Sequence, residues 1–500
     1  MGSGRFLVGA LIAAAVSTPS AAQCPDGTPP PCEREARPAP RSSVAVLYFD
    51  APPGDTSLAY LADGLTESVI YRLSQAGLAV ASRYQVRRFR NRATGDPATL
   101  GRILGVANLL AGTVRAVGPD LQVSIEMIRA SSAVRLWGQQ FERPEQDLLR
   151  IESDIAAAVA DSIVRRLQPA QRRALVASPS TSPAAYDHYL RGRYYLAQRT
   201  EPTIRRAIQE LEEASQLDSR SARLKAEVGV AYTIYFGLGG SSIPGVPPDA
   251  ILARAFAAAD TALRLDSLNA TAWHARAAAL HARLEGDPAR DMTSAARAAE
   301  RSLSLDSLDP EAWHTFGSVL MDAAADSGAA TAFRRALTLD PRRAITLERF
   351  ARLSLFRHQF AEALRLLDSA LAVEPGFNVR AIQYRRALAL VRLGRVDSAE
   401  AALARGADFF ADARLLVLIA GNDSAAARLG VEHLRQPSWP AVEVLAALGE
   451  HDRALTMLEA IAQPTLSFLN LLRLPEMDPI RSDPRFQRLY AASLPLVPVQ

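Results

Sequence analysis

Two kinds of hydrophobic periodicity divide this chain into a short amino-terminal part and a longer helical part. Between residues 121 and 128, apolar residues alternate with Gln, Ser and Glu, which is the two-residue period of a strand with one covered face. Beyond residue 183 the apolar positions recur every three or four residues, as in amphipathic helices. The pattern predicts a multidomain protein, with a small α/β domain (a mixed sheet with helices) followed by an all-α region.

The amino-terminal domain is expected at residues 42–167, with the element order β-α-β-α-β-β-β-α. The predicted strands lie within 43–49, 77–83, 107–117, 121–128 and 134–138, and the predicted helices within 61–75, 96–106 and 147–167. Asp96 or a residue beside it is the expected N-cap of the second helix. We expect Val134 and Leu136 on the covered face of a β-hairpin, and the helices on one side of the sheet.

Residues 42–167 resemble a known domain family. The opening strand "SVAVLYF", the helix start "ADGLTE", "LGVANLLAGTVR" and "RLWGQQFER" are similar to the TolB-like amino-terminal domain that occurs beside tetratricopeptide repeats and bacterial signalling modules. The resemblance spans nearly the whole region and brings no catalytic residues with it. It implies a domain that binds a ligand or a partner.

The helical part repeats itself. In residues 310–341, Trp313 and Gly317 lie on a first helix, Ala329 and Phe333 lie on a second, and Pro341 follows. This arrangement, which recurs after 34 residues, resembles the tetratricopeptide pattern. Small residues at these positions would let two helices approach closely, and neighbouring pairs must stack to bury their apolar faces. We expect about seven such units in an all-α tetratricopeptide solenoid over residues 183–464.

The tetratricopeptide resemblance implies a right-handed superhelix whose concave face binds a protein or peptide. The family's groove positions map onto Glu311, His314, Ser318, Met321 and Asp322 in one unit, onto Glu348, Arg352, Leu355 and Phe356 in the next, and onto His274 and His281 one unit earlier. For each position the alternative of an ordinary solvated residue stays open, because exposed polar residues need no function.

The remaining segments are interpreted as a targeting signal, two linkers and a C-terminal capping segment. Residues 1–22 have a basic start, an apolar run and small residues, as in a secretory signal peptide, which predicts export to a periplasm or cell envelope. Residues 23–41 form a Pro-rich linker, 168–182 a second linker, and 465–500 a helical capping segment. Lipid attachment at Cys24 is disfavoured by Gln23, and a disulfide between Cys24 and Cys32 is left open.

Composition and motifs argue against most enzyme and nucleic-acid functions. The net charge of +4 over 500 residues is weak, and the basic cluster at residues 83–92 is interpreted as a solvated loop in preference to a nucleic-acid surface. Metalloprotease, hydrolase, P-loop and dinucleotide-binding motifs are absent. His274 and His281 lack a third ligand nearby, so no metal or cofactor is expected. No later segment is apolar enough to span a membrane.

These observations lead to one hypothesis, one main alternative and a third class, an enzyme that would need a pocket with converging titratable groups in the α/β domain. The hypothesis is a non-enzymatic, exported adaptor whose repeats bind a protein or peptide partner in the concave groove, with envelope association left open. The alternative is a sensory or regulatory module of a bacterial signalling system that lacks its kinase, cyclase or DNA-binding output domain.

Overall fold

The computed structural model describes residues 39–494 except 82, 88, 91–95, 145–146, 165–167, 177–181, 238–245, 247–249, 284–287, 407–410, 422, 425–426, 428–429, 431–438 and 463–465. The predicted signal peptide, both cysteines and almost all of the Pro-rich linker lie outside the described residues. No helix in the described part of the chain combines the length and the apolar character needed to cross a membrane.

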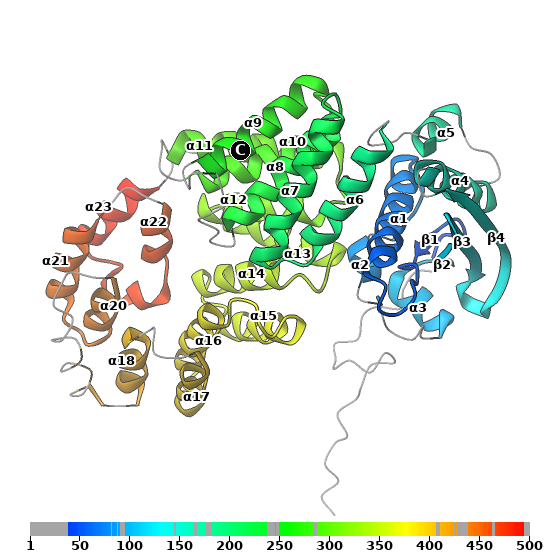
Figure 1. The fold of residues 1–500 in the computed structure, drawn as a ribbon. Helices are drawn as coiled ribbons and strands as arrows, with labels where there is room; N and C mark the ends of the chain where they lie inside the picture. The colour runs from blue at the N-terminus through cyan, green and yellow to red at the C-terminus, as the bar shows by residue number, and fades with distance from the viewer. Residues whose placement is uncertain are drawn as a thin grey trace, which may run out of the picture.

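The amino-terminal domain is a mixed sheet with the strand order β1-β2-β3-β4 (Figure 1). Its strands are β1 (Val44–Val46), β2 (Asn108–Val117), β3 (Asp120–Arg129) and β4 (Val134–Pro144), and its helices are α1 (Thr56–Gln75), α2 (Arg83–Arg87), α3 (Pro97–Leu104) and α4 (Leu148–Ile163). β1 is parallel to β2, and the other pairings are antiparallel. The mixed sheet is confirmed, although the strand expected at 77–83 is only an isolated bridge from Val80 to Val44.

Helices cover both faces of this sheet, so the expectation of helices on one side is wrong. Val44 and Leu110 join a core that contains residues of α1 and α4. Consecutive residues of a strand point to opposite faces, and Ala45 and Leu109 accordingly pack with α3 on the other face. The start of α3 follows the sequence, because the Asp96 side chain accepts a hydrogen bond from the Thr99 backbone amide.

The β-hairpin has its predicted covered face on β3 but not on β4. The alternating apolar residues of β3 are buried, as expected. A register shift between Met127 and Ile128 places Trp137 opposite Met127, and Val134 and Leu136 are exposed. The prediction for Val134 and Leu136 is wrong because a bulge adds one residue and reverses which side chains face the core.

From residue 183 onward the chain forms helix pairs that stack in sequence (Figure 1). The pairs are α6 (Pro183–Ala197) with α7 (Glu201–Leu217), α8 (Ala222–Gly237) with α9 (Ala250–Leu265), α10 (Ala270–Ala282) with α11 (Pro288–Leu305), α12 (Pro310–Asp322) with α13 (Asp326–Leu339), α14 (Ala344–Phe356) with α15 (Phe360–Val373), and α16 (Val379–Arg392) with α17 (Val396–Gly406). This stacking of helix pairs is the arrangement that the repeat pattern predicts.

Close approach within a pair depends on the small residues of the repeat. A Cβ atom added to Gly317 of α12 would lie 2.7 Å from Cδ1 of Phe333 on α13, which is too close for a carbon–carbon contact. Ala329, Phe333 and Ala336 of α13 are fully buried. The spacing of small and large residues therefore sets the distance between the two helices.

The last part of the chain folds back towards the middle of the helical array. We call residues 411–494 the C-terminal unit; it contains α18 (Ala411–Ala420), α20 (Trp439–Ala447), α21 (His451–Ile461), α22 (Leu466–Leu472), the 3-10 helix η3 (Pro475–Ile480) and α23 (Pro484–Ser493). Val444, Leu458, Leu472, Met477 and Phe486 share one core within it. In Figure 1, α22 lies on the side of this unit that faces α12, and the two helices are in contact.

The α/β domain and the first helix pairs share a continuous core. It extends from β1 through α1 and α4 to Tyr186 and Leu190 of α6, and on to α8 and α9. The short helix α5 (Pro169–Val176), which follows α4, also packs on α1. The two parts of the chain are therefore in firm contact.

Candidate functional site

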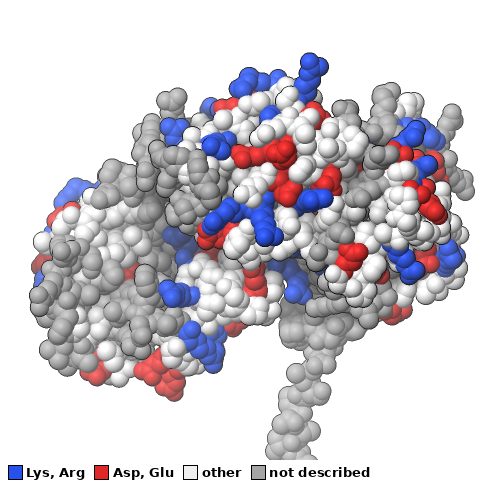
Figure 2. Space-filling view, in the orientation of Figure 1, with Lys and Arg blue, Asp and Glu red and all other residues white. Residues whose placement is uncertain are grey.

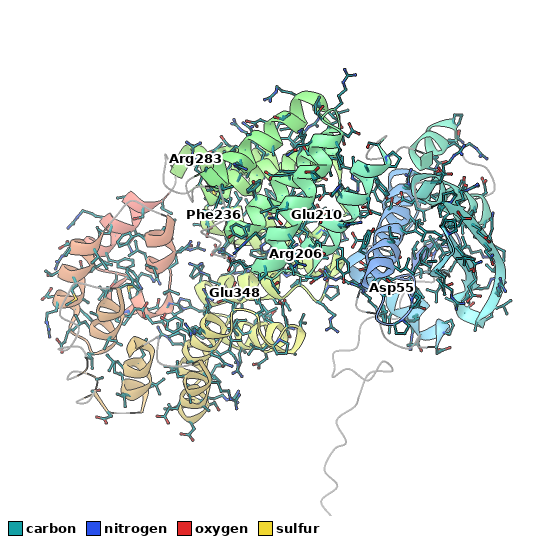
Figure 3. The ribbon with its side chains drawn as sticks, in the orientation of Figure 1. Asp55, Arg206, Glu210, Phe236, Arg283 and Glu348 are labelled. Atoms are coloured by element: carbon teal, nitrogen blue, oxygen red, sulfur yellow. The ribbon has the colours of Figure 1, made fainter. Side chains whose placement is uncertain are left out.

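The predicted groove residues lie on the first helices α10, α12 and α14, and most of them are buried. Those that are buried are His274, Glu311, Ser318, Met321, Asp322, Glu348, Leu355 and Phe356. His281, His314 and Arg352 are partly buried. In Figure 3, Glu348 lies on α14 near the centre of the molecule. The buried positions are part of the packing between helices and are therefore not ordinary solvated side chains.

Polar groove residues pair with the next first helix along the array. His274 Nε2 lies 3.1 Å from Thr315 Oγ1 on α12, and His314 Nδ1 lies 3.0 Å from Thr346 Oγ1 on α14. Glu348 forms an ion pair with Arg385 of α16. These contacts join the successive first helices α10, α12, α14 and α16, and we call the side of the array that these helices form the inner surface.

Glu311 is a buried carboxylate with two arginine partners. Its carboxylate accepts hydrogen bonds from Arg343, just before α14, and from Arg199, between α6 and α7. Burial alone would raise the pKa of Glu311, but the two guanidinium groups hold it well below its usual range. Burial, reinforced by Arg343, lowers the pKa of His314 well below its usual range, so this imidazole is neutral at pH 7.

Arginines dominate the part of the inner surface formed by α14. Burial, together with Arg349 and Arg385, lowers the pKa of Arg352 to about 10, so Arg352 stays charged at neutral pH. Its guanidinium carbon lies 5.5 Å from the ring centre of Phe356. Leu355 packs against Ala363 and Ala389 of the neighbouring helices, which places it between helices.

The chain's own C-terminal unit contacts the α12 end of the predicted groove. Asn470 Nδ2 of α22 donates to Asp322 Oδ1 at 2.8 Å, and His281 Nε2 lies 2.7 Å from the other oxygen of that carboxylate. Arg473 Nη1 donates to the Met321 carbonyl oxygen at 2.5 Å. Burial would raise the pKa of Asp322, but the His281 hydrogen bond keeps it below its ordinary value.

A second set of contacts links the C-terminal unit to α14 and α16. Arg392 of α16 lies 3.8 Å from Glu476 and 3.7 Å from Asp478, and His358 lies 3.5 Å from Asp478. The guanidinium carbon of Arg473 lies 4.4 Å from the ring centre of Phe356. The sequence pattern did not reveal these residues as part of the site, because the repeat spacing carries no information on contacts that the last helices make far back in the chain.

A separate polar cavity of about 340 Å³ lies where the α/β domain meets α6. It is lined by the loop after β1, the first part of α1, Arg90 and Tyr194, and Asp55, which Figure 3 labels, precedes α1. Asp63 lies 2.5 Å from Arg90, and burial raises its pKa to about 7, although Arg90 opposes this.

The basic segment at residues 83–92 is partly structural, so its interpretation as a solvated loop is wrong where side chains are described. Residues 83–87 form α2, and Arg87 donates to the backbone carbonyl of Ala197 at the end of α6. The guanidinium carbon of Arg90 lies 5.7 Å from the ring centres of both Tyr48 and Tyr194. Arg88 and Arg92 lie outside the described residues.

On the face shown in Figure 2, basic and acidic side chains are interspersed. Among the described residues, His, Cys, Asp and Glu form no group of three that could hold a metal ion.

Comparison with known proteins gives one curated relative. No protein-family model matches the chain. A protein of Rhizobium meliloti (strain 1021) named "Putative adenylate cyclase 3" is 27% identical over 202 residues, which are 40% of this chain and 34% of that protein. The match thus spans about a third of the relative's length.

Solved structures that are similar to parts of this chain include tetratricopeptide repeat proteins. Pseudomonas aeruginosa pilF has a TM-score of 0.35 and 20% identity over 44% of this chain and 98% of its own. A thermophilic repeat protein of Thermus thermophilus has a TM-score of 0.34 and 15% identity over 42% of this chain and 100% of its own. A tetratricopeptide repeat protein of Parabacteroides merdae ATCC 43184 has a TM-score of 0.33 and 15% identity, covering 53% and 98%. The assignment of helix pairs above depends on the helices and their contacts alone.

Proposed function

We propose that this protein is a non-enzymatic adaptor, exported to the periplasm or cell envelope, whose stacked helix pairs hold a protein or peptide partner on their inner surface. The observation that carries the proposal is that this surface already contacts a polypeptide segment, residues 469–478, through directed polar contacts. A surface that binds one segment through side chains and a backbone carbonyl has the chemistry needed to bind another.

The inner surface combines features of a peptide-binding site. It offers the Arg349, Arg352 and Arg385 cluster beside Glu348, with Asp322 near its end. The Phe356 ring lies close to two guanidinium groups, those of Arg352 and Arg473. Charged groups that are held by fixed partners select a ligand by the position and sign of its own charges, and they contribute less to the overall affinity.

The test begins with proximity labelling of the full chain in its native compartment, followed by affinity measurement with the purified partner. The double variant R349Q/R352Q removes charge from the inner surface. R365Q is the matched control, because Arg365 is exposed on α15 and pairs only locally with Glu362. We expect at least a tenfold weaker affinity for the double variant and no change for R365Q. Equal affinities for all three proteins would contradict the proposal.

A second candidate function is a regulatory module of a bacterial signalling system. The name of the Rhizobium meliloti relative favours it, because that protein is named as a cyclase and this chain matches only about a third of it. Under this proposal the chain binds a signalling partner and does not convert ATP to cyclic AMP. A cyclase assay on the purified chain tests this, and measurable turnover would overturn the non-enzymatic assignment.

A further inference from the structure

The C-terminal unit presents a polar face to α12, α14 and α16 that is complementary in charge at both ends. At one end, the cationic Arg473 contacts Asp326 at the start of α13 and the Met321 carbonyl. At the other end, Asp478 lies 3.7 Å from Arg392 and 3.5 Å from His358. Asn470 lies one helical turn before Arg473 and donates to Asp322. This face therefore meets the inner surface as a ligand would, with opposite charges aligned.

The fit of this resident ligand is incomplete. Among the described residues of this segment, Asn470 Oδ1 and Glu476 Oε2 are buried and have no hydrogen-bond partner. A buried polar atom without a partner costs roughly 1–3 kcal/mol. The Glu476 carboxylate is 3.8 Å from Arg392, beyond hydrogen-bond distance. Both atoms belong to the resident segment, so a partner segment that fills the site without burying an unpaired polar atom would avoid this cost and bind the surface better.

We propose that the inner surface of α12, α14 and α16 selects a partner segment with an Asn-x-x-Arg helical turn followed about five residues later by an acidic residue, and that residues 469–478 occupy this site as an internal competitor. Asp322, Asp326, the Met321 carbonyl and the Phe356 ring would receive the amide and guanidinium groups, and Arg392 would receive the carboxylate. This inference rests on the proposed adaptor function and defines the partner's chemistry.

An internal competitor predicts a specific response to weakening its contacts. A tethered segment acts at an effective concentration on the order of millimolar, so a free peptide competes poorly until the tethered contacts are lost. The variant R473Q removes the resident guanidinium and leaves the receiving residues intact. Arg485 provides a matched control, because it pairs with Glu459 at 2.5 Å within the C-terminal unit.

The experiment measures fluorescence anisotropy of a labelled peptide of residues 466–482 added to the full-length chain. We expect R473Q to bind this peptide at least tenfold more tightly than the wild type does, and R485Q to behave as the wild type. A peptide carrying Gln at the position of Arg473 should bind the R473Q chain at least tenfold more weakly. The double variant R473Q/D326N should lose the gain, because the receiving carboxylate is then absent.

Several outcomes would overturn the inference. If R473Q keeps its native circular dichroism and gains no affinity for the peptide, the C-terminal unit is only a structural part of the fold. Equal binding of the Arg and Gln peptides would exclude recognition of the guanidinium. If R473Q does not fold, the milder variant N470A is used with the same readouts. If R473Q gains no peptide affinity but R349Q/R352Q loses partner binding, only this inference is overturned. If R349Q/R352Q binds the partner as the wild type does, the proposed function itself is overturned.

Discussion

At the scale of single residues, the molecule relies on buried charges that have fixed partners. Glu152 of α4 is fully buried and accepts hydrogen bonds from Ser68 Oγ at 2.6 Å, from Arg72 Nη2 at 3.2 Å and from the Tyr186 hydroxyl of α6. Burial raises the pKa of Glu152 to about 7, although Arg72 opposes this. This carboxyl group therefore ties the α/β domain to the first helix pair.

Replacing Glu152 with Ala should strongly destabilise the protein. The change leaves Arg72, whose side chain is 1% exposed, as a buried charge without its carboxylate. Breaking a buried pair in this way typically lowers the free energy of unfolding by about 3–5 kcal/mol. Urea denaturation followed by circular dichroism measures the change. The control is E362A, which disrupts an exposed pair and should cost less than about 1 kcal/mol; similar losses in both variants would contradict the prediction.

The carboxyl group of Asp63 should make stability depend on pH in a defined direction. Its pKa is raised from 3.8 to about 7 in the folded protein, so the folded state binds a proton more tightly than the unfolded state. This contribution is fully present below about pH 4 and is lost as pH rises to about 7. From pH 4 to pH 8 the wild type should therefore lose on the order of 3 kcal/mol relative to D63N. Urea titrations of both proteins check this, and parallel pH profiles would refute it.

At the scale of elements, the distance between paired helices is set by small residues. Gly317 and Phe333 are in contact where α12 crosses α13, and an added Cβ would lie within 2.9 Å of two ring carbons. G317A should therefore lower the free energy of unfolding by about 1–3 kcal/mol through overpacking. Gly376 has no atom within 4 Å of its added Cβ and serves as the control. Equal unfolding midpoints for G317A and G376A would contradict this account.

The sequence predicted those elements whose pattern is local. The helix pairs follow from a spacing of about 34 residues, and the strand β3 follows from simple alternation, so both could be recognised without knowledge of the fold. The exposure of Val134 and Leu136 could not, because a bulge one residue away changes the facing of the whole segment. The strand predicted at 77–83 is reduced to the single bridge between Val80 and Val44, because β1 is short. The local sequence pattern does not show the length of the partner strand.

The sequence placed the predicted groove residues on the first helices of the pairs but could not show what surrounds them, and their role as a binding site stays a prediction. The repeat pattern located the positions of Glu311, Asp322 and Glu348 on the first helices, yet it could not show that each meets a charged or polar partner. Asn470 contacts Asp322 across 148 positions of sequence. Such a contact depends on the curvature of the entire array, which is a sum of small rotations between pairs and is not written in any one segment.

At the scale of the whole molecule, the α/β domain and the repeats behave as one packed body. Arg193 of α6 lies 2.7 Å from Glu67 of α1 and 2.8 Å from Glu227 of α8. Tyr60 of α1 donates to Asp187 of α6 at 2.6 Å. The core beneath these contacts is continuous, so the α/β domain and the first helix pairs bury each other's apolar side chains.

A chain that begins at residue 182 should consequently lose protection in its first helix pair. Without α1 and α4, Tyr186 and Leu190 are exposed, and each large apolar side chain contributes about 1.5–3 kcal/mol when buried. Hydrogen exchange of residues 182–494, compared with residues 39–494, should show at least tenfold faster exchange in α6 and α7. Helices α14 and α15 are the internal control and should exchange at the same rate in both chains. Unchanged protection of α6 would mean that the first helix pair is stable without the α/β domain.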